Sequence, residues 1–486
     1  MKRELRSVAL IVALSGACAP DAAQVTTPDA SATEAAVVDS ASDSAPADVA
    51  ADALRPDAAP LDAATADVTA RDVSPPDAAR DVSPPDAAPI DAAPADVTRD
   101  AGPLDAAPVD APSIDAAVDA RADLPAPGDT APADVARPDV TPAPPTFTTV
   151  FSTRPTSNLP DLAIEDAIVD LINRAIPGSR VRVAVYTFTR GRVSTALLNA
   201  RRRGVDVQVV VDGGADTTVG SEVPALISGL GATNVTVCRA PGTACLGTGI
   251  MHHKSYLFSA LDDGSRDVVM QASHNLTNAQ LSLHNNAVIV RGDAALFRAY
   301  ERTFDDLRRD TAMPDYYRID DGDLATRAYF FPRASGDTAV SILDNATCDA
   351  TSRILVAMAF FTDARVEVAR SLAARRRAGC AVTVVAGDDE IPLGATVAST
   401  LTAAGVTLVR YPGRTNGWGL HSKYVLIDAP YAGSAAHRRL VFTGSHNWTG
   451  PSLDQNDETL LRVENDAVFE AFAADHARVR AAAARP

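Results

Sequence analysis

Two short stretches of the chain repeat a combination of residues that suits chemistry on a phosphoryl group. The chain has 41 arginines but only three lysines, and Lys254 and Lys423 each stand two residues after a histidine, His252 and His421. Each His-x-Lys opens an apolar strand, so its two side chains point to the same face. A compact ammonium charge beside an imidazole can hold an anionic phosphoryl group next to a nucleophile or a proton donor.

A second shared motif follows each of these pairs. Ser273 and Asn275 match Ser445 and Asn447, and a histidine separates the two residues in both cases. Hydroxyl and amide groups can donate hydrogen bonds to phosphoryl oxygens, alongside the two ammonium groups. We therefore expect these four residues to bind the substrate.

Three other residues near the motifs allow a structural interpretation. His253 follows His252 directly and points to the opposite face of an extended strand, so we interpret it as structural. Trp418 and Trp448 flank motifs of the second half. Their positions fit a cleft wall, a lipid contact or core packing.

This pattern resembles the phospholipase D superfamily, whose signature is HxKxxxxD followed by GSxN, usually twice per active site. The second half matches it at His421, Lys423, Asp428, Gly444, Ser445 and Asn447, with Glu458 where the family often has a carboxylate. The first half departs in three places: Ser259 occupies the Asp position, Ala272 replaces the first Gly, and Asn286 stands where Glu458 does. The resemblance covers about residues 147–486.

The resemblance implies a phosphodiesterase that needs no metal and no cofactor. The catalytic set that it implies is His252, Lys254, His421, Lys423, Asp428 and Glu458. By similarity, His252 forms a phosphohistidine intermediate, and His421 protonates the leaving group and then activates water; the reverse assignment stays open. The pKa values of the two imidazoles must then be pushed apart. The sequence shows no cluster of histidines and carboxylates at metal-ligand spacing.

The two halves differ in the residue that could orient each histidine. We expect Glu458 to orient His421, whereas the first half offers only Asn286. This asymmetry fits two histidines with different roles, and it also fits a weakened site.

An internal repeat indicates the fold. The apolar strand pattern at 179–189 recurs at 352–362, and each copy precedes a helical stretch that ends in three arginines and a glycine, then a second strand. Strand, helix and strand in this order predict an α/β sheet built twice. With the resemblance, we expect two pseudo-symmetric, mixed-sheet α/β sandwich lobes at 147–320 and 321–486. We interpret the arginines as charge at helix C-termini rather than as a phosphate patch.

Four cysteines follow Cys18. In an exported protein their even number predicts two disulfides, which we place at Cys238–Cys245 and Cys348–Cys380. A zinc site is the alternative, but the spacing lacks a CxxC pair.

The N-terminus has the features of an export signal. Basic residues precede an apolar run at Val8–Leu14, and a small-residue site ends at Cys18. Residues 1–18 resemble a bacterial lipoprotein signal, in which the cysteine is lipidated; simple cleavage and secretion is the alternative. We therefore expect the protein to be exported and then either held in the cell envelope by a lipid anchor or secreted.

Residues 19–146 have the composition of a disordered tether. They carry 25 acidic and 6 basic residues, contain no aromatic residue, and repeat RDVSPPDAA at 71–79 and 80–88. The 340 residues that follow carry 36 acids and 35 bases. A near-neutral catalytic region argues against a strongly basic nucleic-acid binder. The absence of an apolar run of about 18 residues argues against a membrane span.

Export, near-neutral charge and aromatic residues near the motifs favour a phospholipid as substrate, cleaved at its head group. An extracytoplasmic nuclease of the same superfamily is the main alternative. A catalytically inactive module that binds phosphoryl groups is a second alternative, because the first-half motif is incomplete. We expect a monomer, since one chain supplies both halves of the site.

Overall fold

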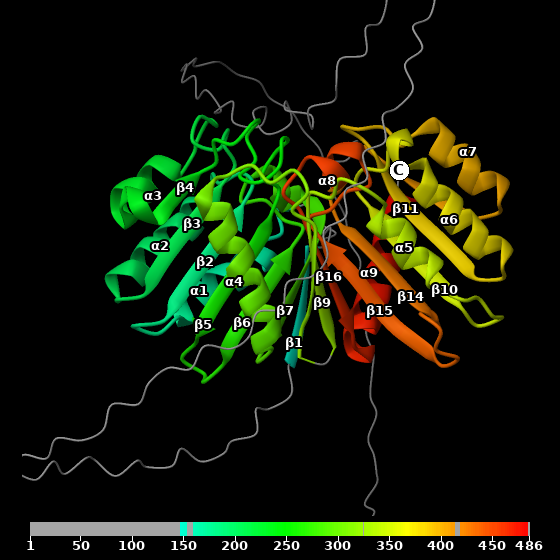
Figure 1. The fold of residues 1–486 in the computed structure, drawn as a ribbon, viewed down its shortest axis with the longest axis horizontal. Coiled ribbons are helices and arrows are strands. Elements are labelled where there is room, and N and C mark those ends of the chain that lie inside the picture. Colours follow the sequence, from blue (N-terminus) through cyan, green and yellow to red (C-terminus); the bar gives the residue numbers. More distant parts are fainter. Residues whose placement is uncertain (1–145, 153–158, 324, 414–417, 485–486) are drawn as a thin grey trace, which may run out of the picture. The chain divides into compact units, whose positions relative to one another are not determined.

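The computed structural model describes residues 146–152, 159–323, 325–413 and 418–484. The predicted signal peptide with Cys18, and the predicted tether as far as residue 145, lie outside the described residues. The described chain forms two sheets of eight strands each, covered by helices (Figure 1). The two-lobe α/β architecture is confirmed.

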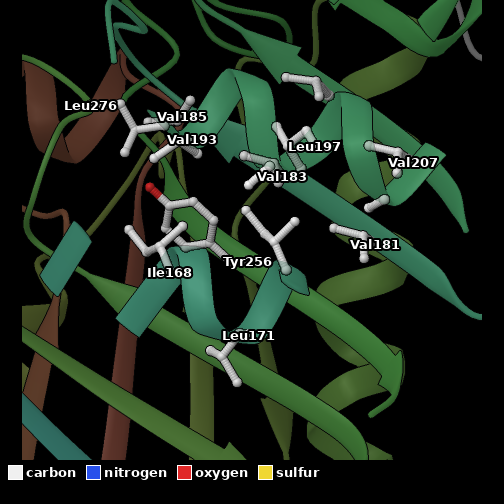
Figure 2. Close-up of a cluster of buried hydrophobic side chains, with 14 of the residues drawn as sticks. Ile168, Leu171, Val181, Val183, Val185, Val193, Leu197, Val207, Tyr256 and Leu276 are labelled. Atoms are coloured by element: carbon white, nitrogen blue, oxygen red, sulfur yellow. The ribbon is translucent and has the colours of Figure 1, made fainter. Parts of the chain in front are cut away.

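The sheet of the first lobe has the strand order β1-β7-β6-β5-β2-β3-β4. In that order the strands span Thr146–Ser152, Leu283–Arg291, Arg266–Ala272, Lys254–Ala260, Arg180–Val185, Asp206–Val211 and Val235–Val237. Helices α1 (Ala163–Arg174), α2 (Gly191–Arg202) and α3 (Val223–Leu230) pack on one face of this sheet. In the resulting core, the Tyr256 ring from β5 lies among aliphatic side chains (Figure 2).

The second lobe repeats this order. Its sheet runs β12-β11-β10-β14-β15-β16-β9-β8. In that order the strands span Thr407–Pro412, Ala381–Asp388, Arg353–Met358, Lys423–Pro430, His437–Gly444, Thr459–Glu464, Thr326–Phe330 and Arg318–Asp321. Helices α5 (Thr338–Asp344), α6 (Val366–Arg377) and α7 (Ala395–Ala403) pack on it, and α8 (Gly450–Asp454) follows β15. The pairing is parallel at β10–β11 and β2–β3 and antiparallel at β10–β14 and β2–β5, so β14 corresponds to β5.

The two lobes share an apolar core. The faces of both sheets that are turned away from the outer helices pack with α4 (Ala294–Arg309) and α9 (Asp466–Ala483). Phe297 of α4, Phe330 of β9 and Phe469 of α9 belong to this one cluster and are at most 2% exposed. Burial of this apolar surface holds the lobes in one arrangement.

One short strand crosses from the second half to the first sheet. Residues Gly419–Leu420 form β13, which pairs with β7 at Leu283 and His284. The segment just before the second His-x-Lys therefore belongs to the sheet of the first lobe. This crossover brings His421 to the boundary between the lobes.

The arginine triplets lie at the C-terminal ends of α2 and α6, as predicted. Gly204 and Gly379 follow them with φ of 90° and 110°, a backbone region that favours glycine. Arg203 donates to the carbonyl of Ile172, and Arg375 to that of Ala346. These side chains stabilise the packing of neighbouring helices.

Both predicted disulfides are present, Cys238–Cys245 and Cys348–Cys380, with Cα separations of 4.7 and 5.0 Å.

Among the described residues, no helix is long and apolar enough to cross a membrane.

Buried histidines predict how folding stability depends on pH. His476 of α9 is 3% exposed and donates to the Val356 carbonyl, and burial lowers its pKa to about 4. Its ring is protonated in the unfolded chain below about pH 6.5 but stays neutral in the folded chain. Stability is therefore lost as the pH falls from about 6.5 toward 4. Between pH 7 and pH 5 this histidine costs about 2 kcal/mol.

We expect the His476→Gln variant, which keeps an amide donor for Val356, to lose about 2 kcal/mol less than wild type between pH 7 and pH 5. Urea unfolding at both pH values measures this difference. Equal losses in the two proteins would contradict the assignment of a neutral buried His476.

Candidate active site

The two His-x-Lys motifs lie at equivalent ends of equivalent strands. Lys254 is the first residue of β5 and Lys423 is the first residue of β14. Each lysine ammonium donates to the carbonyl of the histidine two residues before it, at 2.8 Å in both lobes. His252 is 5% exposed and His421 is 8% exposed. The motifs thus form two matching, nearly buried pairs of imidazole and ammonium groups.

Each histidine is held in place by the other lobe. The backbone N–H of His252 donates to the carbonyl of Asp457 at 2.9 Å. The N–H of His421 donates to the carbonyl of His284 at the same distance. These crossed backbone bonds bring the two motifs together at the lobe boundary.

His252 pairs with a carboxylate from the second lobe. Its Nδ1 lies 2.9 Å from both carboxylate oxygens of Glu458, which is fully buried. Burial alone would raise the pKa of Glu458, but the interaction with His252, with smaller contributions from His446 and Lys254, outweighs it and brings the pKa to about 2. The expectation that Glu458 orients His421 is therefore wrong: Glu458 orients His252.

His421 pairs with a neutral side chain instead. Its Nδ1 lies 2.9 Å from the Oδ1 of Asn285, a residue that the sequence analysis missed. Burial lowers the pKa of His421 well below the usual range, and the charges of Lys423 and Lys254 lower it further. In the unliganded protein His421 is therefore neutral near pH 7, with Nδ1–H donated to the amide oxygen.

A loop-length difference of one residue between the lobes explains why the sequence indicated Asn286, and not Asn285, as the residue that orients a histidine. The N–H of Ser273 donates to the carbonyl of Asn286, whereas the N–H of Ser445 donates to that of Thr459, one residue farther along the chain. The loop after the first Ser-His-Asn motif is therefore one residue shorter. Asn286 instead accepts from the N–H of Lys423 at 3.3 Å. Matching the strands rather than counting from the motif would have found the true partner.

The serines of the second motif orient the histidine partners. The Ser273 hydroxyl donates to the Oδ1 of Asn285 at 2.9 Å, and the Ser445 hydroxyl donates to a carboxylate oxygen of Glu458. The structure therefore corrects the prediction that these two hydroxyls bind the substrate. The two hydroxyls instead orient Asn285 and Glu458, which in turn orient the imidazoles of His421 and His252.

The asparagines of the same motif are available for a ligand. Asn275 is 7% exposed and Asn447 is fully buried. Within the described part of the chain, the Oδ1 of Asn275 and both amide atoms of Asn447 have no hydrogen-bond partner. Buried amide groups of this kind are normally satisfied, so a bound polar group is the expected partner.

Asp428, predicted to be catalytic, lies away from this group. It is five residues beyond Lys423 on β14, which corresponds to about 16 Å along a strand. Its carboxylate contacts the Nδ1 of His437 at 2.8 Å and forms an ion pair with Arg353 at 3.3 Å. The prediction that Asp428 is catalytic is therefore wrong, and its contacts are those of a structural residue.

The first lobe fills the same position with a hydroxyl. Ser259 accepts from the backbone N–H of Arg180 at 2.8 Å. Because this position ties strands together at the far end of the sheet, the change from Asp to Ser leaves the catalytic groups intact.

Two aromatic rings that the sequence analysis missed border the lysines. The Lys254 ammonium lies 5.5 Å from the centre of the Tyr186 ring, and the Lys423 ammonium lies 5.9 Å from that of Phe360. Tyr186 also makes an edge contact with His252, with 5.4 Å between ring centres. Both aromatic residues are partly exposed and flank the two charges.

The two tryptophans and His253 belong to the packing. Trp448 packs on Phe361 at 4.7 Å and Trp418 lies 5.5 Å from His284, and both tryptophans are at most 3% exposed. His253 is buried, contacts the Thr459 hydroxyl, and has its pKa lowered by burial to about 3. Core packing is thus the interpretation that fits these three residues.

One group of side chains within the described residues has metal-ligand spacing. It consists of Cys238, Cys245 and Asp310. Because the two sulfurs form a disulfide, they are not available as thiolate ligands.

The comparisons with known proteins now give the family. A family model described as "Cardiolipin synthase, PLD-like domain" matches residues 168–308 and 342–479, which is more than half of the chain. The chain belongs to this PLD-like family. The two matched segments correspond to the two lobes, and each contains one His-x-Lys motif. No match was found among curated proteins.

Solved structures with a similar fold have low sequence identity to this chain. A polyphosphate kinase from Porphyromonas gingivalis has a TM-score of 0.47 and 11% identity, over 69% of this chain and 50% of its own. A phosphatidylserine synthase from Haemophilus influenzae has a TM-score of 0.47 and 13% identity, over 68% of this chain and 88% of its own. Nuc, a phospholipase D family member from Salmonella typhimurium, has a TM-score of 0.27 and 20% identity, over 37% and 98%. These likenesses are too distant to indicate an activity.

The difference between the two histidine partners leads to a prediction about the pKa of His421. Replacing Asn285 by Asp puts a carboxylate against Nδ1, which favours the protonated ring and raises the pKa of His421. We expect the protonation constant of His421 to rise at least tenfold. Ring-nitrogen NMR during a pH titration measures it, and the exposed His437 in the same spectra is the internal control. An unchanged titration of His421 would contradict the site geometry.

Proposed function

We propose that this protein is a phosphodiesterase that hydrolyses phospholipid head groups through a phosphohistidine intermediate, without a metal ion. The observation that carries this proposal is the crossed arrangement of two imidazoles, one facing the buried Glu458 carboxylate and one facing the neutral Asn285 amide. Two histidines of the same fold thereby acquire different chemical roles.

In the first step, Lys254 and Lys423 hold the two non-bridging oxygens of the diester, and the amides of Asn275 and Asn447 add hydrogen bonds. Nε2 of His252 attacks phosphorus, and the bond to the leaving oxygen breaks. The attacking ring becomes positively charged and keeps its Nδ1–H, which donates to Glu458. A buried carboxylate stabilises this charge directly.

His421 supplies the leaving oxygen with a proton in the same step. Burial and the two lysine charges lower the pKa of His421 in the unliganded protein, and an anionic diester that binds between the lysines offsets their part of this effect, so the substrate itself favours the protonated ring. In the second step the neutral ring accepts a proton from water. The resulting hydroxide attacks phosphorus and releases His252.

Three features favour a phospholipid among diesters. The residues after the predicted tether have a net charge of −1, which gives little general attraction for a polyanion. The family model is described as a cardiolipin synthase. The predicted export signal and two disulfides fit an extracytoplasmic protein, with Cys18 as the proposed lipid anchor.

A substrate with a good leaving group separates the two histidine roles. With bis(p-nitrophenyl) phosphate the leaving phenolate needs no acid, so the His421→Asn variant should complete the first step and stall at the second. We expect a burst of about one p-nitrophenol per chain, and a p-nitrophenyl phosphoryl group on His252 by mass spectrometry. A burst in His252→Asn but not in His421→Asn would reverse the two roles.

The substrate class is tested with mixed phospholipid vesicles beside single-stranded DNA, with EDTA present throughout. We expect release of choline or ethanolamine, at least a thousandfold reduced in His252→Asn and unchanged in the control His437→Asn. DNA cleavage with intact lipid would replace the lipid proposal by a nuclease. Inactivity on every diester would favour a phosphoryl-binding module.

A further inference from the structure

A glycine-rich loop of the first lobe packs on the segment that carries Glu458. The loop spans Cys238–Ile250 and is closed by the Cys238–Cys245 disulfide. The N–H groups of Thr248 and Gly249 donate to the carbonyl of Gln455, at 2.9 and 3.0 Å. The loop therefore contacts the second lobe through its backbone, directly ahead of Glu458.

The centre of this contact is a ring of N–H donors around one carboxylate. Asp457 is fully buried, and its oxygens accept from the N–H groups of Cys245 and Gly247 at 2.7 Å and of Leu246 at 3.2 Å. Three consecutive N–H groups that converge on an anion form a nest. One of the three donors is the disulfide cysteine itself.

Asp457 is bonded to both members of the catalytic pair. It directly precedes Glu458 in the chain, and its carbonyl accepts from the N–H of His252 at 2.9 Å. Its own N–H donates to the carbonyl of Ile250 at 3.0 Å. The position of Asp457 therefore affects both the Glu458 carboxylate and the His252 imidazole.

Close approach of the loop requires glycine at two positions. A Cβ on Gly247 would lie 1.8 Å from the carbonyl oxygen of Gln455, and one on Gly249 would lie 2.2 Å from the Oδ1 of Asn456. The glycines of this loop thus permit the nest to close on Asp457.

Among the residues that the structure describes, no corresponding nest lies beside the partner of the other histidine, His421. The residue before Asn285 is His284, whose ring contacts the hydroxyl of Tyr411 at 3.1 Å and lies beside Trp418. The nest is therefore specific to the His252 side of the site.

From these contacts we propose that Asp457 is a positioning residue for the His252–Glu458 pair, and that the Cys238–Cys245 disulfide makes turnover sensitive to reduction. This inference rests on the proposed phosphodiesterase function. Opening the disulfide releases a loop whose order the cross-link maintains. The nest then loosens, and the buried Asp457 carboxylate loses the donors that fix it.

The reduction is a two-electron exchange. Dithiothreitol supplies two electrons and two protons, the disulfide becomes two thiols, and dithiothreitol becomes its cyclic disulfide. The second disulfide, Cys348–Cys380, lies ahead of β10 and β11, at the strand ends away from the active site. It provides a matched control.

The test measures turnover of bis(p-nitrophenyl) phosphate by the oxidised full chain. Three proteins are compared: wild type, Cys238→Ser/Cys245→Ser and Cys348→Ser/Cys380→Ser. We expect kcat to fall about 10- to 100-fold in the first double variant, with KM changed less than twofold, because the lysines and asparagines that hold the diester are untouched. The second double variant should keep wild-type kcat until dithiothreitol is added. Full kcat in Cys238→Ser/Cys245→Ser would overturn the proposal.

A measurement independent of turnover separates this inference from the proposed function. The Nδ1 proton of His252, assigned by its loss in His252→Asn, should give a downfield NMR signal from its bond to Glu458. We expect the signal to disappear in Cys238→Ser/Cys245→Ser and in Asp457→Asn, and to persist in Cys348→Ser/Cys380→Ser. A signal unchanged in the first two variants would contradict the positioning role, even in a protein that turns over no diester.

Discussion

A carboxylate that is fully buried stays ionised only when a positive group and hydrogen bonds compensate its lost hydration. Glu458 meets this requirement with hydrogen bonds from the His252 imidazole of the other lobe and from the Ser445 hydroxyl, and with the nearby Lys254 ammonium. Because Glu458 lies just before β16 and His252 just before β5, the pair exists only while the shared core docks the two sheets. The crossover strand β13 and the backbone bonds between the lobes maintain the same docking.

The pseudo-symmetry of the lobes makes the differences between them informative. Each histidine has the same lysine two residues later, the same serine behind its partner and the same backbone anchor in the opposite lobe. The side chain that contacts Nδ1 differs, Glu458 for His252 and Asn285 for His421. A carboxylate favours positive charge on one ring, while an amide leaves the other ring exposed to the repulsion of two ammonium groups. The different roles proposed for the two histidines therefore depend on the change of this side chain within a duplicated fold.

The sequence contained enough to predict the repeated motifs, the two α/β lobes and both disulfides, because each depends on local pattern or on pairing within one lobe. The partners of the histidines were not predictable in the same way. Glu458 and Asn285 act across the lobe boundary, and a loop one residue shorter moves the relevant position from Asn286 to Asn285. The position of Asp428 could have been predicted from the sequence, because five strand residues span about 16 Å and must place it away from Lys423.

The most direct test of the account is a pair of double-mutant cycles on unfolding free energy at pH 7. One cycle combines Glu458→Gln with His252→Gln, and the other combines Glu458→Gln with His421→Gln. Crossed pairing predicts a coupling of about 1.5 to 3 kcal/mol in the first cycle and a value near zero in the second. A larger coupling between Glu458 and His421 would contradict the crossed arrangement on which the proposed chemistry rests.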